Sequence, residues 1–277
     1  MDWIVGIQQA IDYIEDNLTE TIDYEEVGKI SCSSSYHFQM DWDNVGLLCG
    51  RGTKEVKTVL VALDPFESVC QEAVQMGADL LLTHHPLIFQ PISAVNDQTT
   101  VGRAVLQLIS HDIAAINAHT NLDCAAGGVN DTLAAVLGLE NIQVIPSGDT
   151  DWGLLRQGTV CAQPLDAFLA HVKETLGCRG LRYTDGGKPV RQVAVGGGSC
   201  AGALEEVAAL GCDTFITADV KYNQFWDAHD LGVNLVDAGH FYTENPVCRV
   251  LAEKLQAAFP EIRVMLSKKH DDCMKFF

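Results

Sequence analysis

Basic residues are scarce in this sequence of 277 residues, which has 18 lysines and arginines against 37 aspartates and glutamates. The formal net charge of −19 argues against the basic surface by which nucleic-acid-binding domains hold phosphates. We therefore expect no DNA partner. An anionic ligand has to be held locally, by metal ions, helix N-termini or a few basic side chains.

Long apolar runs are also missing. Stretches such as Leu80–Leu82 are far too short to cross a bilayer, so no membrane partner is expected. Residues 1–7 have neither the positive segment nor the small-residue cleavage site of a signal or transit peptide. The expected compartment is the cytoplasm.

No CxxC pair occurs among the ten cysteines, which are scattered along the chain. This pattern favours reduced thiols packed in the core over a disulfide framework.

An internal repeat is the most informative pattern in the sequence. Residues 56–64 align without a gap on residues 190–198, at an offset of 134. The same offset relates four identical pairs: Glu72 and Glu206, Gly77 and Gly211, Asp79 and Asp213, Thr83 and Thr217. Each copy has an alternating apolar strand, a helix that ends at glycine, and a short strand that ends at threonine. Chance similarity between two βαβ units is the alternative.

Each copy then runs through a helical stretch to a further strand, over residues 113–117 and 234–237. The predicted fold class is therefore α/β, with two similar domains related by duplication, each a layered mixed sheet with helices. We place the first repeat at 41–139. The second, at 140–277, begins with added strands at 152–161 and 181–184 and a helix at 165–175.

Candidate metal ligands follow these strands. His84, His85 and Pro86 end one strand, and the last strand of each copy is followed by a histidine with an acid four residues later. These two motifs are His119 with Asp123, and His240 with Glu244. Imidazole and carboxylate ligands suit Zn, Fe, Mn, Co or Ni.

Two ions are expected, because adjacent histidines at a strand end should point to opposite sides. Five ligands shared by two ions leave open positions, as in catalytic sites, where a bound water can reach a pKa of about 7. His119 is either a sixth ligand or a residue that orients Asp123.

Five motifs, at residues 42–47, 83–86, 119–123, 219–222 and 239–244, together resemble the GTP cyclohydrolase 1 type 2 homologue family. The resemblance extends from about residue 41 to the end of the chain. It implies a toroidal homohexamer with two metal ions per subunit lining an internal cavity. Matched residue by residue, its ligands fall on His84, His85, Asp123, His240 and Glu244.

The resemblance also implies an activity, because some members look like enzymes that open the imidazole ring of GTP by metal-assisted hydrolysis. For others, metal delivery or regulatory binding has been proposed. We therefore predict a metal-dependent hydrolase of a purine nucleotide that acts through metal-bound water. The alternative is a non-catalytic metal carrier or metal-dependent interaction protein.

Basic and glycine-rich segments near the second motif suggest where phosphates bind. Lys221 and the turn around Gly197 are the candidates, since backbone amides of such a turn can bind anions. Two residues depart from the family pattern: Ala218 and Asn223 stand where glycine and histidine are common. They put in doubt any chemistry assigned to that imidazole.

The first forty residues do not resemble the usual start of this family. They resemble the opening of an AraC-type helix-turn-helix domain, with Ile4, Ile7, Ile11 and Ile14 on one face of a first helix. The segment has eight acidic residues and one base, Lys29, and it breaks off at Met40. We interpret it as a truncated remnant of a gene fusion or the product of a misplaced start, whose helices pack on the main body. The alternative is a DNA-reading fusion, against which the acidic composition argues.

Overall fold

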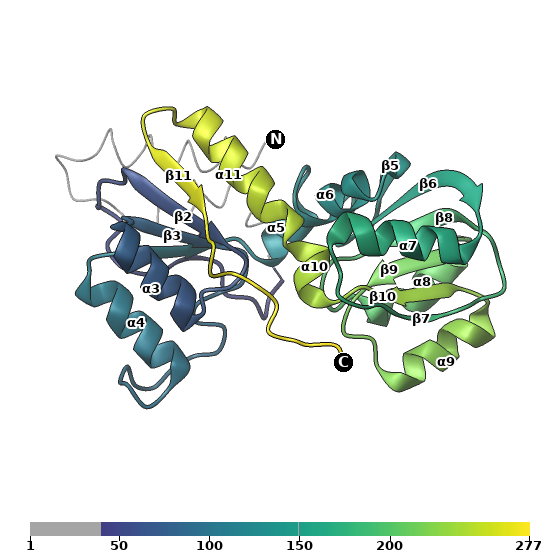
Figure 1. Cartoon of the computed structure of the whole chain (residues 1–277), viewed down its shortest axis with the longest axis horizontal. Helices are drawn as coiled ribbons and strands as arrows, with labels where there is room; N and C mark the ends of the chain where they lie inside the picture. The colour runs from purple at the N-terminus through teal and green to yellow at the C-terminus, as the bar shows by residue number, and fades with distance from the viewer. Residues whose placement is uncertain (1–39, 149) are drawn as a thin grey trace. The chain divides into compact units, whose positions relative to one another are not determined.

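The computed structural model describes residues 40–148 and 150–277, which form two compact units (Figure 1). The first unit contains the described residues up to Ala126 together with Cys248–Asp271. The second contains Gly127–Val247 and Asp272–Phe277. The repeat boundaries at 41–139 and 140–277 stay a prediction about the duplicated segments. The predicted helical segment at the N-terminus lies outside the described residues, apart from Met40.

The first unit is a five-stranded mixed sheet with helices. Its elements are β1 (Gly46–Cys49), β2 (Thr58–Ala62), α3 (Glu67–Met76), β3 (Leu80–Thr83), α4 (Thr100–Ser110), β4 (Ala114–Asn117), α5 (Thr120–Cys124), α11 (Pro246–Ala258) and β11 (Arg263–Leu266). The strand order is β1-β4-β3-β2-β11, with β1 antiparallel and the other strands parallel. The chain thus returns to this sheet with its last strand, which the sequence did not indicate.

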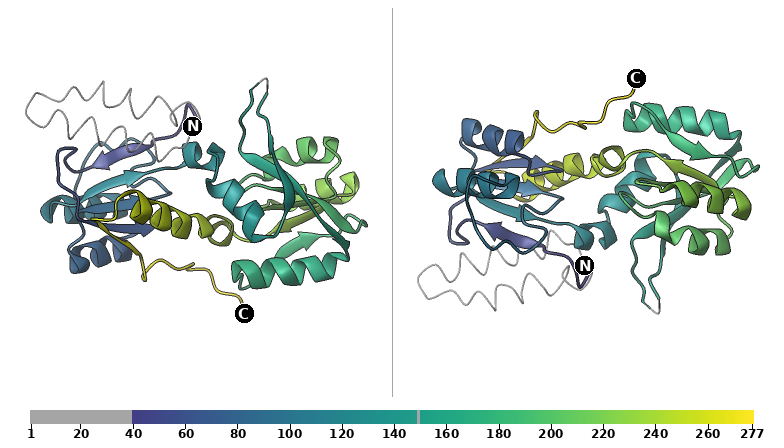
Figure 2. Two further views of the ribbon diagram at one scale, coloured as in Figure 1. Left: turned by 90° about the horizontal axis from the view of Figure 1, so that it is seen from above. Right: turned by 90° about the horizontal axis from the view of Figure 1, so that it is seen from below.

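The second unit is a six-stranded mixed sheet in the order β5-β6-β8-β9-β10-β7. Its elements are α6 (Val129–Val136), β5 (Glu140–Ile145), β6 (Leu155–Gln163), α7 (Leu165–Leu176), β7 (Arg182–Thr184), β8 (Val190–Val195), the 3-10 helix η2 (Ala201–Ala203), α8 (Leu204–Ala209), β9 (Thr214–Thr217), α9 (Tyr222–Leu231), β10 (Asn234–Asp237) and α10 (His240–Glu244). Strands β8, β9 and β10 are parallel. The added strands and helix predicted before the second repeat are present as β6, β7 and α7, and Figure 2 shows the β5–β6 hairpin projecting from this unit.

The register of the two sheets confirms the duplication. Val59 of β2 pairs with Leu80 of β3, and Val193 of β8 pairs with Thr214 of β9. Both residues of the second pair lie 134 positions after those of the first, which is the offset of the sequence repeat. The central parallel strands of the two units are therefore equivalent residue by residue.

Two aligned aspartates have the same role in both units. The carboxylate of Asp79 accepts hydrogen bonds from the backbone amides of residues 57 and 58, at 2.9 and 3.0 Å. The carboxylate of Asp213 accepts from those of residues 191 and 192, at 3.0 and 2.8 Å. Each aspartate precedes the second parallel strand of its unit and fixes the start of the first, which explains why the repeat retains it.

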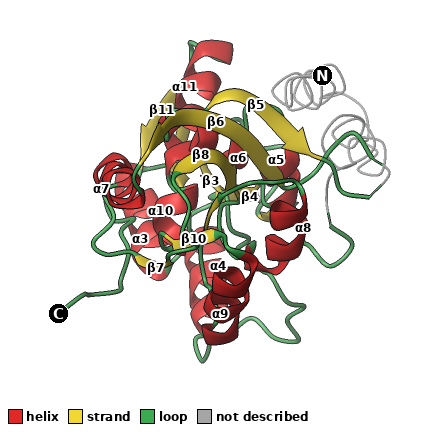
Figure 3. Cartoon of the chain, turned by 90° about the vertical axis from the view of Figure 1, so that its right-hand side faces the viewer, coloured by secondary structure: helices red, strands yellow, loops and turns green. Residues whose placement is uncertain are grey.

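Alternating side chains of the second sheet pack against helices on both faces, and Figure 3 shows α7 and α8 on opposite sides of it. Val193, Val195, Ile216 and Val236 pack in one cluster with Leu133 of α6 and with Phe168 and Val172 of α7. Ala194, Phe215 and Leu235 pack in a second cluster with Val207 of α8 and Ala228 of α9. Buried strands covered on both faces have the continuous apolar sequences seen here.

In the first unit, α3 and α4 cover one face of the sheet and α11 lies on the other (Figure 1). Leu60 and Leu81 pack in one cluster with Val69 of α3 and Leu108 of α4. Among the described residues of both units, no helix is long and apolar enough to span a membrane.

Candidate metal centre

His84 and His85 follow the last residue of β3, at the carboxyl end of the parallel strands. Their rings lie next to each other, with centroids 4.9 Å apart. The expectation that they point to opposite sides is wrong. Alternation holds only within a pleated strand, and the chain bends at these two residues, directly after Thr83.

The His84 side chain is fully buried. Its Nδ1 lies 2.8 Å from the carbonyl oxygen of Ala118, so Nδ1 carries the proton and Nε2 has the lone pair. Nε2 lies 3.6 Å from Oδ1 of Asp123, a residue of α5. Two donors about 2.1 Å from one tetrahedral ion are about 3.4 Å apart, so this pair has the spacing of two ligands of one metal.

A carboxylate orients His85. Nδ1 of His85 lies 2.7 Å from Oδ1 of Asp64, which follows β2. The other oxygen of Asp64 lies 3.9 Å from Nε2 of His270, and this nitrogen accepts a hydrogen bond from the amide of Leu63 at 3.1 Å. Burial lowers the pKa of His270, which favours the neutral ring that this bond requires. The segment after β11 thus supports the carboxylate behind His85.

His119 has the same kind of partner. Its Nδ1 lies 2.7 Å from Oδ1 of Asp43, whose other oxygen accepts from the amide of Thr120 at 3.0 Å and from its hydroxyl. Burial tends to raise the pKa of Asp43, but the hydrogen bonds from His119 and Thr120 outweigh it and hold this pKa at about 2. His84, His85 and His119 each bring a ligand atom to within 4.8 Å of the others.

The depressed pKa of Asp43 predicts a loss of stability in acid. Its folded-state pKa of about 2 lies below the ordinary 3.8, so protons bind the unfolded chain first as the pH falls. The stabilisation is present above pH 4 and is lost towards pH 2, and it amounts to about 2 kcal/mol. In chelator-treated protein, the difference in unfolding free energy between wild type and Asp43→Asn should shrink by this amount between pH 5 and pH 2. A difference that is independent of pH would contradict the assignment.

The two motifs with histidine and acid are one residue out of register. In β3 and β4, Leu80 pairs with Ala114, and in β9 and β10, Thr214 pairs with Asn234. The offset between the copies is therefore 120 here, which matches His240 with Thr120 and His119 with glycine 239. Helices α5 and α10 are equivalent in length and position, but they present their ligands from different helical positions.

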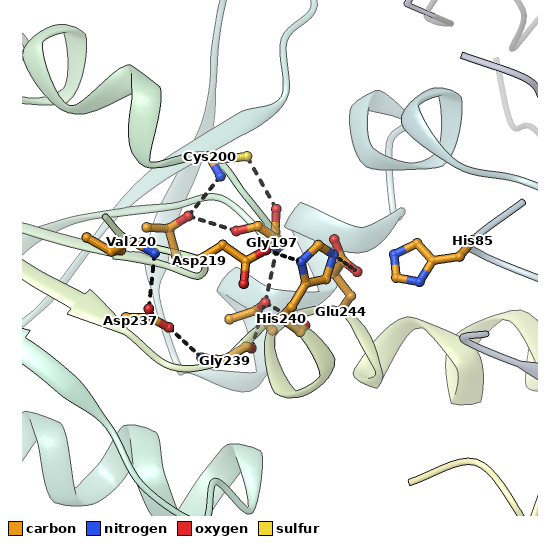
Figure 4. Close-up of polar contacts among 12 residues, drawn as sticks. His85, Gly197, Cys200, Asp219, Val220, Asp237, Gly239, His240 and Glu244 are labelled. Atoms are coloured by element: carbon orange, nitrogen blue, oxygen red, sulfur yellow. Dashed lines mark hydrogen bonds and ion pairs between the residues drawn. The ribbon is translucent and has the colours of Figure 1, made fainter. Parts of the chain in front are cut away.

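In the second unit, His240 and Glu244 project from α10 (Figure 4). Nδ1 of His240 lies 2.7 Å from Oδ2 of Asp219, and Nε2 lies 3.0 Å from Oε2 of the buried Glu244. Asp219 has a φ of 53°, in the left-handed region, which aspartate adopts more readily than most residues other than glycine.

The glycine-rich turn after β8 lies against these two side chains (Figure 4). The amide of Gly197 donates to Oδ1 of Asn130 at 2.7 Å, and that of Gly198 donates to Oγ1 of Thr243 at 3.0 Å. A Cβ on Gly198 would overlap Oε1 of Glu244 and would lie 3.0 Å from Nε2 of His240. The turn therefore makes room for the candidate ligands, and phosphate binding by Gly197 stays a prediction.

The other residues predicted near phosphate lie around α9. Lys221 is exposed at the N-terminus of this helix, and its amide donates to the side chain of Gln224 at 2.8 Å. Asn223 donates to Asp227 at 3.3 Å, whereas Ala218 is fully buried. A substrate contact of Lys221 stays a prediction.

The donors fit a divalent transition metal. In each of the four histidines, Nδ1 meets an oxygen acceptor, so Nε2 has the lone pair when the ring is neutral. Metal-binding histidines have this arrangement, because a bond to the second nitrogen fixes the tautomer and the ring. The partners Asp43, Asp64 and Asp219 were not among the predicted site residues, although two of them lie in motifs that the sequence singled out.

Comparison with known proteins shows the family of this chain. Residues 27–272 match the model of the family described as Duf34/NIF3 (NGG1p interacting factor 3). The chain belongs to the DUF34/NIF3 family. A Clostridium perfringens member named GTP cyclohydrolase 1 type 2 homolog is 35% identical over 240 residues, which cover 85% of this chain and 92% of that protein. A Streptomyces coelicolor protein of the same name is 38% identical and covers 83% and 86%. The resemblance stated from the motifs is confirmed.

Solved structures of similar sequence share the fold. A hypothetical protein from Staphylococcus aureus is 30% identical with a TM-score of 0.81, covering 87% of this chain and 94% of that one. A Bacillus cereus protein related to NIF3 is 25% identical with a TM-score of 0.83 and covers 94% and 100%. These likenesses extend over both sheets of the chain.

Proposed function

We propose that this chain binds two divalent transition metal ions through His84, His85, Asp123, His240 and Glu244, and hydrolyses a purine nucleotide. The observation that carries the proposal is the pairing of each candidate imidazole with an acceptor at Nδ1. Zn, Fe, Mn, Co and Ni suit this set of imidazoles and carboxylates. The names of the curated relatives give the reaction class, which is that of a GTP cyclohydrolase.

In this proposal His84, His85 and Asp123 of the first unit and His240 and Glu244 of the second unit are metal ligands. Bound divalent ions would polarise the substrate and lower the pKa of a water to about 7. Asp43, Asp64 and Asp219 would keep His119, His85 and His240 in the tautomer that ligates. His119 would be either a further ligand or a support for the helix that carries Asp123.

Turnover of GTP is the first test. Purified protein reconstituted separately with Zn, Mn, Fe, Co or Ni should release formate from GTP, because opening the imidazole ring by hydrolysis expels C8 at that oxidation level. A chelator should abolish the release, and Glu244→Gln should reduce it by at least about 100-fold, as expected for a lost ligand. Lys221→Ala should raise KM with less effect on kcat if Lys221 contacts phosphate.

A metal carrier gives a different result. Such a protein would bind exchangeable ions and transfer them to an acceptor such as a chelating dye, with no change in GTP under any metal. Absence of GTP turnover with all five metals would refute the hydrolase. Metal binding would then be tested separately, by measuring the ion content of the protein.

The predicted homohexamer is retained as part of the proposal. Light scattering of the metal-loaded protein should give six times the monomer mass of 30.1 kDa. A monomer at micromolar concentration would contradict it.

A further inference from the structure

Two exposed aromatic residues of the first unit lie beside the candidate metal ligands. Trp42 precedes β1, and Phe89 lies in the loop that follows His85. Their ring centroids are 6.0 Å apart, and each also contacts His119, at 6.2 Å from Trp42 and 6.0 Å from Phe89. The interplanar angles of 77° to 87° are those of edge-to-face packing.

His119 joins these two rings to the metal ligands. Its centroid lies 5.2 Å from that of His84 and 5.6 Å from that of His85. Exposure falls along this row of rings, from 60% at Trp42 and 42% at Phe89 to 0% at His84. The five rings therefore form a continuous path from solvent to the buried imidazoles.

Burial does not account for the outer two rings. Trp42 and Phe89 leave much of their apolar surface in water, where it contributes little to folding. The edge-to-face arrangement holds the rings at fixed angles, and part of each ring stays accessible to solvent. Such rings bind flat π-systems, and every purine or other heterocyclic base has one.

We propose that Trp42 and Phe89 form a stacking subsite for the planar heterocyclic ring of a ligand whose reacting atoms lie at His84, His85 and His119. This inference rests on the proposed function and adds to it the part of the substrate that is recognised. Because both rings contact His119, a base stacked on them would lie beside the imidazole cluster. The ring-opening chemistry proposed above acts on the base itself, and this placement would bring the base next to the candidate ligands.

The experiment compares two probes that differ in the base. GTP and inorganic tripolyphosphate are titrated calorimetrically into the full-length, zinc-loaded protein, and the ratio of their affinities is taken. Stacking is worth about 1–3 kcal/mol for each base, so Trp42→Ala should lower this ratio by about 5- to 150-fold. Phe89→Ala should lower it as well, and Trp42→Phe, which retains a ring, should lower it less.

A matched control is Trp226→Ala in α9. Trp226 is 56% exposed and also packs edge-on against a histidine, His229, at 5.9 Å. This variant should keep the wild-type ratio. Metal content and thermal unfolding are recorded for each protein, and because tripolyphosphate reports the metals alone, a variant that loses ions lowers both affinities together.

Three results would overturn the subsite. They are a wild-type protein that binds GTP no more tightly than tripolyphosphate, a ratio unchanged in both Trp42→Ala and Phe89→Ala, and an equal fall in the Trp226→Ala control. A change of oligomer mass in Trp42→Ala without a change of ratio would assign the patch to a subunit contact instead. Failure of GTP turnover would refute the hydrolase, while the ratio would still report stacking.

Discussion

Replacing His84 by alanine is expected to leave at most one tightly bound ion per subunit and to abolish formate release from GTP. The His84 ring is fully buried, and its Nε2 lies 3.6 Å from Asp123. Without the imidazole, a metal at this position loses one of its protein ligands. Because loss of a residue that merely supports a ligand weakens metal binding 10- to 100-fold, loss of His84 should weaken it by at least about 100-fold.

The measurement is elemental analysis of protein purified without chelator, followed by competition with a chelating dye. His229→Ala is the control, because this side chain is 61% exposed and is not one of the candidate ligands. Equal metal content in wild type and His84→Ala would show that His84 is not a metal ligand.

Gly198→Ala is expected to have an effect of similar size, although glycine is no ligand. The added Cβ would overlap Glu244 and approach His240, so both side chains would have to leave the positions in which the turn holds them. We expect metal affinity to fall by about 100-fold, as for a lost ligand. The fall should be seen in dye competition, with the first-unit ligands still in place.

A control separates this clash from backbone strain. Gly198 has a φ of 64°, which disfavours any side chain, and Gly177 at the end of α7 has nearly the same φ, 69°. A Cβ on Gly177 would meet nothing within 4 Å. Gly177→Ala should therefore reduce stability by about 1 kcal/mol and leave metal affinity unchanged. If both variants lost metal affinity to the same extent, backbone strain and not the lack of space beside Glu244 would be responsible.

Much of the fold could be predicted from the sequence, because local patterns indicate which residues form its strands and helices. The duplicated strands, their helices and the threonine at each strand end follow from apolar alternation and from one offset. The pairing of β11 with β2 could not be predicted. It joins Arg263 to Thr58, far apart in sequence, and the corresponding place beside β8 in the second sheet is taken by β6, an antiparallel strand from a different part of the repeat.

The ligand candidates could be found because histidines at strand ends are distinctive. Asp43 and Asp219 lie in motifs that the sequence singled out, but nothing local indicates that they pair with histidines, and Asp64 lies in no such motif. Asp43 and Asp64 meet their histidines only through long-range folding, across 76 and 21 residues. The shared spacing of histidine and acid also suggested that His119 and His240 are equivalent positions of the repeat. The strand register corrects this, because it aligns His240 with Thr120.

The return of the chain to its first sheet has a consequence for biosynthesis. Residues 127–247 emerge from the ribosome as one stretch, so most of the second unit can fold while translation continues, and only its residues 272–277 come later. Strand β2 must wait for residues 263–266, and Asp64 behind His85 must wait for His270. Full support for this metal ligand is therefore assembled only after His270 has left the ribosome.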